Sequence, residues 1–254
     1  MPSSGSSELA PPTPETPRTL FVAAPNYKGA SGSFVISTLK LQAALARRGD
    51  KLHPWFVENE SNIDRARAKA VTAFLATDAT HLLFLDTDIG VDGEAILQMR
   101  DCDKPIICAT IALKHIDMEA VVQVARENPE LSAQACFSWG VTFAFAGDPT
   151  QFDDLMKPQK IHRGGTGVML IRRDVVAAVF SRYLAELGCK HQDVFFVDMF
   201  KTSIDPTTRD QIGTDYSFCD RARACGFETW LAPWVQTTHR GEYTFRSSLL
   251  DLAE

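Results

Sequence analysis

The 254-residue sequence predicts an α/β domain with a mixed, mainly parallel central sheet that is flanked by helices. Short apolar runs alternate with segments of helical periodicity from residue 19 to about residue 100, as in successive β-α-β units. The run at 82–85 is apolar without interruption, which is typical of a strand buried on both faces. Polar residues directly follow the first three runs, and open parallel sheets bind ligands at the carboxyl ends of their strands. These observations predict one shared ligand cleft.

The first half of the predicted domain begins with a strand at 19–24, which ends at Pro25-Asn26. A helix follows that Ser33 can cap and Gly49 stops, and a second strand spans 52–57. Ser61 or Asn62 opens the next helix, which leads to the apolar third strand. Helices are predicted at 92–100 and 117–127, with a strand at 105–110 between them.

The second half is expected to begin with an extended hairpin at 133–146, because its aromatic and β-branched residues nearly alternate. A strand at 168–171 precedes a helix that ends at Leu187, and a loop carries residues 191–198. A helix within 213–226 and a strand at 227–231 complete the series. Residues 18–254 are expected to form a single domain. Residues 1–17, rich in Pro, Ser and Thr, are expected to be a disordered arm.

The composition narrows the possible functions. A net charge of −6 provides no basic surface for nucleic acid, and no apolar run is long enough to cross a bilayer. The N-terminus lacks a secretory signal pattern. The six cysteines are scattered without a Cys-x-x-Cys pair, which favours reduced thiols in a cytoplasmic protein over disulfides or a zinc site.

The motif Asp86-Thr87-Asp88 follows the third strand directly. Residues i and i+2 of a strand project to the same side, so Asp86 and Asp88 are expected to converge while Thr87 points away. Converging carboxylates repel unless a cation lies beside them, and hard divalent cations prefer oxygen ligands. The motif therefore predicts a metal site. In the alternative, one Asp caps the next segment and the other is solvated.

Asp215 is expected in the first turn of a helix whose apolar stripe includes Phe218 and Ala222. The helix dipole favours an ionised carboxylate there, and such a carboxylate at the rim of a cleft can act as a general base. The alternative is an Asp that only stabilises its own helix.

Three weaker signals have structural alternatives. His239 follows a short apolar segment and can be a metal ligand or a solvated side chain. The glycines within 164–167 precede a strand, so they indicate a close backbone approach to a ligand or merely a turn. Arg65, Arg67 and Lys69 oppose the dipole at the start of their helix, which indicates an anionic partner or a solvated face.

Several short motifs occur in a characteristic order. They are Pro25-Asn26, Arg65-Ala66-Arg67, Asp86-Thr87-Asp88, Lys114-His115-Ile116-Asp117, Gly165-Thr166-Gly167, Asp215 to Cys219 and finally His239. From about residue 20 to residue 245 this order and spacing resembles the GT-A glycosyltransferases of the family 2 type, especially small bacterial and viral members. Thr214 stands where the family commonly has Glu, and Ala112-Leu113 replaces its usual aromatic-Pro pair.

The resemblance implies a single Rossmann-like GT-A domain that transfers a sugar from a nucleotide sugar, by default a UDP-sugar, to a hydroxyl of a glycan or other acceptor, with inversion. Asp215 would be the catalytic base, and Mn²⁺ or Mg²⁺ would be bound by Asp86, Asp88 and His239. The donor nucleotide would be held by Pro25, Asn26, Glu58, Arg67, Asp86 and Thr87. The sugar or acceptor would lie near Lys114, Trp139, Gly165, Thr166 and Gly167.

Two other functions fit parts of the sequence. Asp86-Thr87-Asp88 also resembles the nucleophile motif of haloacid-dehalogenase-like phosphatases, with Asp86 as the nucleophile. Thr110, Lys114 and the acidic residues Asp148, Asp153 and Asp154 follow in a suitable order, but Gly90 stands where that family prefers Thr or Val. A catalytically inactive nucleotide-binding or glycan-binding GT-A module is the third possibility, because Thr214 departs from the pattern.

Overall fold

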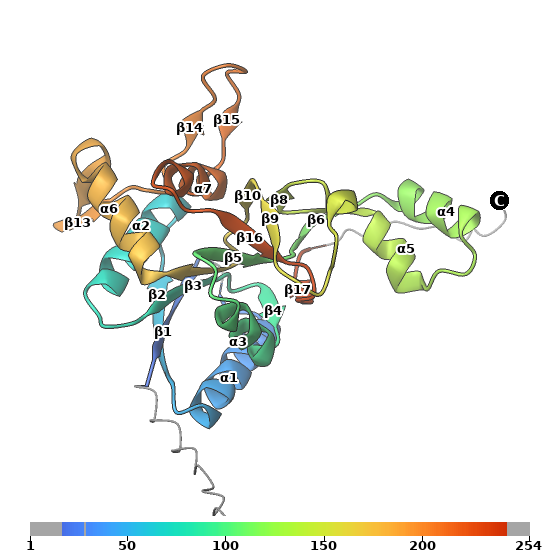
Figure 1. Ribbon diagram of the computed structural model, residues 1–254, viewed down its shortest axis with the longest axis horizontal. Coiled ribbons are helices and arrows are strands. Elements are labelled where there is room, and N and C mark those ends of the chain that lie inside the picture. The colour runs from blue at the N-terminus through green and yellow to red at the C-terminus, as the bar shows by residue number, and fades with distance from the viewer. Residues whose placement is uncertain (1–16, 28, 243–254) are drawn as a thin grey trace, which may run out of the picture.

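The computed structural model describes residues 17–27 and 29–242, so the arm predicted at 1–17 lies almost entirely outside the described residues. A seven-stranded sheet has the order β2-β1-β3-β11-β5-β16-β9 (Figure 1). The strands are β2 (Lys51–Glu58), β1 (Thr19–Asn26), β3 (His81–Leu85), β11 (Val168–Arg172), β5 (Ile106–Ala109), β16 (Thr229–Ala232) and β9 (Gln159–Ile161). Only β11 and β9 oppose the other strands. The predicted α/β fold with a mixed, mainly parallel sheet is confirmed.

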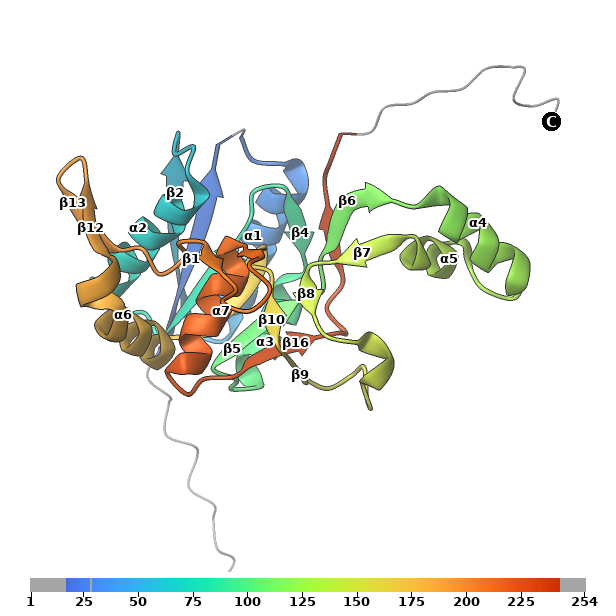
Figure 2. The same ribbon diagram turned by 90° about the horizontal axis from the view of Figure 1, so that it is seen from above.

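Helices cover both faces of this sheet (Figures 1 and 2). One face carries α1 (Gly32–Arg47) and α3 (Gly93–Asp101), and the other carries α2 (Ile63–Leu75), α6 (Arg173–Leu187) and α7 (Thr214–Ala224). The Asn62 side chain accepts from the Arg65 N–H and caps α2 as predicted. The prediction of Ser33 as the α1 cap is wrong, because Ser31 accepts from the Phe34 N–H.

Alternate residues of the central strands build two separate cores. On β1, Phe21 and Ala23 pack with α2, α6 and α7, whereas Leu20 and Val22 pack with α1 and α3. Residues 82–85 of β3 are fully buried, as the uninterrupted apolar run predicts. Because both faces are covered, the polar residues beyond the strand ends are left at the edge of the sheet.

An arm projects from the sheet on the side of β6 (Ala112–Ile116), β7 (Val141–Phe143) and β8 (Phe145–Ala146), and both views show it (Figures 1 and 2). It consists of α4 (Met118–Glu127) and α5 (Ala133–Trp139). The expected hairpin at 133–146 is therefore wrong over its first half. Ser132 caps α5 by accepting from the Ala135 N–H, and Cys136 is buried. The Ser132 cap and the burial of Cys136 therefore stabilise a helix here, although the near-alternation of aromatic and β-branched residues predicts a strand.

Two hairpins project beyond the helices. Residues expected to form a loop at 191–198 instead belong mostly to the hairpin β12 (Gly188–His191) and β13 (Val194–Val197). Gln192 and Asp193 form its turn with positive φ values of 49° and 62°, a conformation that non-glycine residues rarely adopt. The second hairpin consists of β14 (Ser203–Ile204) and β15 (Gln211–Ile212) and leads directly into α7.

Smaller elements complete the fold. A two-stranded ribbon joins β4 (Ile89–Val91) to β17 (Thr237–His239). A further short ribbon pairs β8 with β10 (Arg163–Gly164), and a 3₁₀ turn spans Pro149–Gln151. Among residues 17–27 and 29–242, no helix is both long enough and apolar enough to span a membrane.

Candidate active site

The carboxyl ends of β1, β2 and β3 meet at one edge of the sheet. Asn26 lies opposite Glu58 in the parallel register of β1 and β2, and Asp86 follows the last residue of β3. The Asn26 carboxamide accepts from the Gly29 N–H at 2.9 Å, whereas Glu58 is exposed. Thr87 is buried, and its carbonyl accepts from the Ser31 N–H. The strand ends predicted to share a cleft therefore lie side by side, with Pro25 just before Asn26.

The glycine-rich segment 165–167 links two carboxylates from distant parts of the chain. The Asp86 N–H donates to the Gly167 carbonyl at 2.9 Å, and the Thr166 N–H donates to Asp215 Oδ2 at 3.0 Å. A Cβ on Gly167 would lie 2.6 Å from Ile89 Cδ1 and 3.4 Å from Asp86 Oδ2. A Cβ at position 167 would therefore displace these side chains, whereas the close approach of this backbone to a ligand stays a prediction.

Asp215 lies in the first turn of α7 and is clamped by Arg67 and Thr214. Arg67, on α2 and only 5% exposed, forms an ion pair with Asp215 Oδ1. Arg67 also donates to Thr214 Oγ1 at 2.7 Å, and that hydroxyl donates to Asp215 Oδ1 at 2.7 Å. Thr214, at the position where the resembled family has Glu, therefore completes a hydrogen-bonded triangle. The structure places Arg67 against Asp215.

The two carboxylates differ in their preferred charge. Burial tends to raise the pKa of Asp215, but the Arg67 charge and the hydrogen bonds from Thr214 and Thr166 outweigh it and lower the pKa. Burial raises the pKa of Asp86; Arg67 opposes this rise, and the charges of Asp215 and Asp88 add to it. Asp215 is thus held ionised, whereas burial and the neighbouring carboxylates favour the protonated form of Asp86.

Asp88 faces Lys114 and His239. Lys114, on β6, forms an ion pair with Asp88 Oδ2, and His239 Nε2 lies 3.5 Å from Asp88 Oδ1. The Arg240 N–H donates to the Asp88 carbonyl at 2.9 Å, which fixes β17 next to the motif. His239 Nδ1 lies 2.7 Å from the Ala112 carbonyl, which can only accept, so Nδ1 carries the hydrogen. Nε2 is therefore the His239 nitrogen that faces Asp88.

Asp88 and His239 alone do not make a complete cation site. Asp88 and His239 supply one oxygen and one nitrogen, and the Lys114 ammonium already stands beside Asp88 as a positive charge. Within the described part of the chain, no three His, Cys, Asp or Glu side chains are grouped closely enough to hold a metal ion. A cation bound here would need further oxygens from a ligand such as a diphosphate and from water.

Several residues that the sequence suggested as binding or catalytic groups either lie away from Asp86 and Asp215 or are paired with neighbouring residues. Trp139, at the end of α5, is 66% exposed on the projecting arm. Arg65 and Lys69 both form ion pairs with Glu60, so their position at the start of α2 needs no bound anion. Asp148 accepts from Thr150, and Asp154 accepts from the Met156 N–H, so each of these carboxylates is engaged in its own turn.

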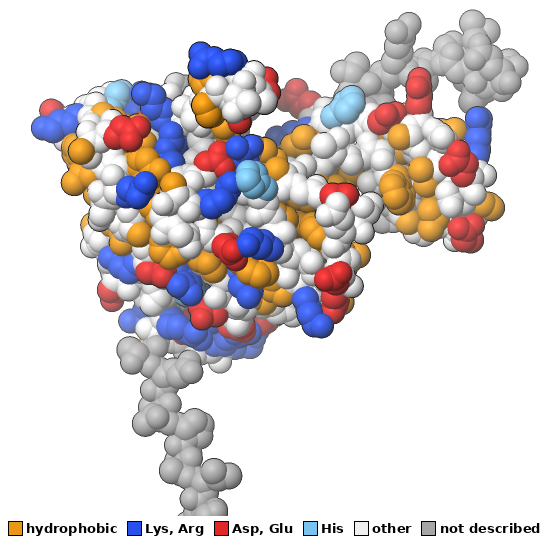
Figure 3. Space-filling model, turned by 45° about the horizontal axis from the view of Figure 1, so that its top comes forward, with side chains coloured by type: hydrophobic (Ala, Val, Ile, Leu, Met, Phe, Trp, Pro, Cys, Tyr) orange, Lys and Arg blue, Asp and Glu red, His pale blue; other side chains and the backbone are white. Residues whose placement is uncertain are grey.

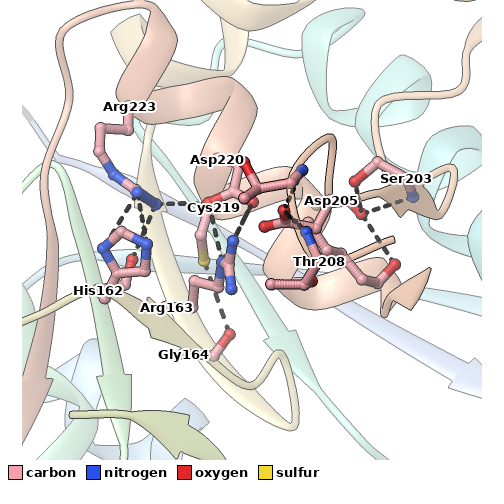
Figure 4. A network of polar contacts seen from close by, with 12 residues as sticks. His162, Arg163, Gly164, Ser203, Asp205, Thr208, Cys219, Asp220 and Arg223 are labelled. Carbon is pink, nitrogen blue, oxygen red and sulfur yellow. Dashed lines mark hydrogen bonds and ion pairs between the residues drawn. The ribbon is translucent and has the colours of Figure 1, made fainter. Parts of the chain in front are cut away.

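One further group of residues near Asp215 was not predicted from the sequence. Arg163 pairs with Asp220 through two of its nitrogens, and Arg223 bridges Asp220 and His162 (Figure 4). Tyr216 follows Asp215 directly and lies beside Arg163. A basic residue on a short strand has no distinctive spacing, so only the tertiary fold reveals this group.

The comparisons with known proteins are distant. No family model matches the chain, and no curated protein matches it. Among solved structures, A197 from STIV is 13% identical over 89% of this chain and 86% of its own, with a TM-score of 0.49. A glycosyltransferase involved in the glycosylation of the major capsid of PBCV-1 is 12% identical over 66% and 67%, with a TM-score of 0.32. The inositol-1-phosphate CTP transferase from T. maritima is 11% identical over 88% and 89%, with a TM-score of 0.41. Likenesses this low assign no function.

Proposed function

We propose that the protein is a metal-dependent, inverting glycosyltransferase that moves a sugar from a nucleotide sugar, by default a UDP-sugar, to an acceptor hydroxyl. The observation that supports this most is that the expected base, Asp215, and the expected ligand pair, Asp88 and His239, all lie close enough to Asp86 to act on its charge. Such a transfer needs a base for the acceptor and positive charge for the leaving group. Asp215 would supply the base, and a cation held by Asp88 and His239, together with Lys114, would supply the positive charge.

The donor side of the site consists of the ends of β1, β2 and β3. Mn²⁺ or Mg²⁺ bound by Asp88 and His239 would neutralise the charge that develops on the leaving diphosphate. Lys114 is placed to contribute a second positive charge there, because it already pairs with Asp88. Pro25, Asn26, Glu58 and Thr87 would surround the nucleotide, and Asp86 would contact the ribose or the cation.

Asp215 would act on the acceptor. Its carboxylate would orient the attacking hydroxyl and take its proton as the oxygen bonds to the anomeric carbon and the bond from that carbon to the diphosphate breaks. A carboxylate with a lowered pKa is a weak base toward a free alcohol. It becomes an adequate base late in the attack, because the hydroxyl grows more acidic as its oxygen bonds to carbon. Attack from the face opposite the leaving group inverts the anomeric configuration.

Thermal unfolding provides the first test of this proposal. Ligands that bind the folded state raise its stability, so UDP-, GDP- and ADP-sugars would be screened with and without Mn²⁺. We expect one nucleotide series to raise the midpoint of unfolding, and to do so more with Mn²⁺ than without it. No shift with any nucleotide in either condition would contradict the proposal. Release of inorganic phosphate from phosphomonoesters would instead support the phosphatase alternative.

A further inference from the structure

A cavity of about 710 Å³ lies beside Asp215. Its walls come from the β14–β15 hairpin, from the start of α7, and from Leu113, Ala144 and Arg163. The volume is in the range of small-molecule sites, roughly 300 to 1,000 Å³. In Figure 3 the hairpin stands off the body of the molecule, and charged side chains gather below it. A ligand in this cavity would have direct access to the Asp215 carboxylate.

The charged residues that line the cavity are mainly acidic. Asp205, Asp210 and Asp215 contribute three carboxylates, and Arg163 contributes one guanidinium. Asp205 accepts from the N–H groups of Thr208 at 2.9 Å and Thr207 at 2.8 Å, and these bonds lower its pKa. Asp210 is exposed, and no described residue bonds to its carboxylate. Because Asp215 is paired with Arg67, Asp205 and Asp210 are the carboxylates of the lining that repel anionic ligands.

Arg163 offsets this repulsion only in part, because it pairs with Asp220, which also pairs with Arg223. Its Nε and Nη2 donate to Asp220 at 2.9 Å and 2.8 Å, so the guanidinium is held in a fixed orientation (Figure 4). The remaining nitrogen, Nη1, donates to no residue in the part of the chain that the structure describes. Arg163 therefore offers the cavity a positioned N–H donor, which suits a hydroxyl or a carbonyl oxygen.

Tyr216 adds an aromatic surface to the cavity. Its ring is half-buried, and the Arg163 guanidinium carbon lies 5.8 Å from the ring centroid. An aromatic ring can cover the apolar CH face of a sugar while its polar surroundings bind the hydroxyls. The cavity therefore combines the Tyr216 ring, the fixed Arg163 donor and the acceptors Asp205 and Asp210 beside the Asp215 carboxylate. This combination matches a polyhydroxylated ligand without negative charge.

We propose that this cavity is the acceptor site and that it selects an uncharged glycan, which places a sugar ring on Tyr216 and hydroxyls against Arg163 and Asp210. This inference rests on the proposed transferase function. It adds a substrate class, because the carboxylates of the β14–β15 hairpin would exclude sugars that bear carboxylate, sulfate or phosphate groups. Asp210 would be the main specificity-determining residue, since its carboxylate is engaged by no other residue in the described ranges.

The test uses the full chain without a donor, on an array of neutral hexose and N-acetylhexosamine oligosaccharides together with uronic-acid and sialylated ones. We expect binding to neutral glycans, with the best ligand then titrated by calorimetry. Tyr216→Ala should lower the affinity for that ligand at least tenfold. Tyr216→Phe keeps the ring, and its affinity should stay within about twofold of the wild-type value. Asp210→Lys should gain binding to acidic glycans. Lys160→Gln is the matched control: it removes an exposed ion pair between Lys160 on β9 and Glu228, and it should change nothing.

The same samples are assayed for hydrolysis of the donor, so that the two proposals can fail separately. Three outcomes would overturn the inference and leave the transferase proposal standing. They are donor hydrolysis without any glycan binding, glycan binding restricted to acidic glycans, and glycan binding that Tyr216→Ala leaves unchanged. Binding at Tyr216 without turnover of any nucleotide sugar would overturn the transferase proposal, and the acceptor role would fall with it.

Discussion

Arg67 donates to the carboxylate of Asp215 across 148 residues of sequence, and this pair joins α2 to the first turn of α7. Thr214 bonds to both partners, and the Thr166 N–H donates to the second carboxylate oxygen. Both oxygens of Asp215 therefore have donors, which fixes the direction of the carboxylate and keeps it ionised. The proposed base is accordingly oriented by groups on two other elements.

Asp215→Asn should abolish most transfer while preserving the fold. The carboxamide has nearly the same shape but cannot accept a proton, and general-base catalysis contributes roughly 10² to 10⁴-fold. We expect kcat to fall by about that factor, with KM for the donor little changed, in steady-state assays with the nucleotide sugar found by unfolding. A kcat within a few-fold of the wild-type value would show that Asp215 only stabilises its helix.

Arg67→Met should destabilise the protein and shift the acid limb of its pH–rate profile to higher pH. Removing one partner of a buried ion pair costs about 3 to 5 kcal/mol, and the partly exposed Asp215 places the expected loss near the lower end. Arg67 lowers the pKa of Asp215, so its loss should raise that pKa and shift the acid limb of the pH–rate profile toward neutral pH. Arg67→Lys keeps the charge and should recover much of the shift. An unmoved acid limb in Arg67→Met would refute the coupling.

Gly167→Ala should be destabilising, because a Cβ would lie 2.6 Å from Ile89 Cδ1 and 2.7 Å from Ile111 Cδ1. Both isoleucines are buried, so overpacking is expected to cost roughly 1 to 3 kcal/mol in urea unfolding. Gly32, in the first turn of α1, has open space around it and an ordinary φ, which makes Gly32→Ala the matched control. Equal stability of the two variants would show that the segment can move aside.

His81 should make the protein less stable in mild acid. Burial lowers the pKa of His81 to about 4, so between about pH 6.5 and pH 4 the unfolded chain binds a proton that the folded chain does not. The contribution of this group to stability is complete above pH 6.5 and is lost as the pH falls, by about 3 kcal/mol at 1.36 kcal/mol per unit. Urea unfolding of His81→Gln should show a shallower decline over this range. The exposed His115→Gln control should retain the wild-type slope.

The sequence predicts those parts of the fold that depend on neighbouring residues. The buried run of β3, the Asn62 cap of α2 and the polar strand ends all follow from local patterns. Helix α5 escaped prediction because its aromatic residues nearly alternate, and the β12–β13 turn uses Gln192 and Asp193 in place of glycine. Long-range partners escaped prediction for a different reason. Nothing near Arg67 in sequence indicates that it pairs with Asp215 rather than with a ligand, and Arg163 carries no motif at all.

The central claim is that Asp88 and a divalent cation promote departure of a nucleoside diphosphate. The most direct test incubates the protein with a panel of UDP-, GDP- and ADP-sugars in the presence of Mn²⁺ or of EDTA. Chromatography then measures how much nucleoside diphosphate is released. The account predicts Mn²⁺-dependent release from one nucleotide series by the wild-type protein and by Lys160→Gln, and a loss of at least 100-fold in Asp88→Ala. No release from any sugar in the panel, or equal release by Asp88→Ala, would contradict it.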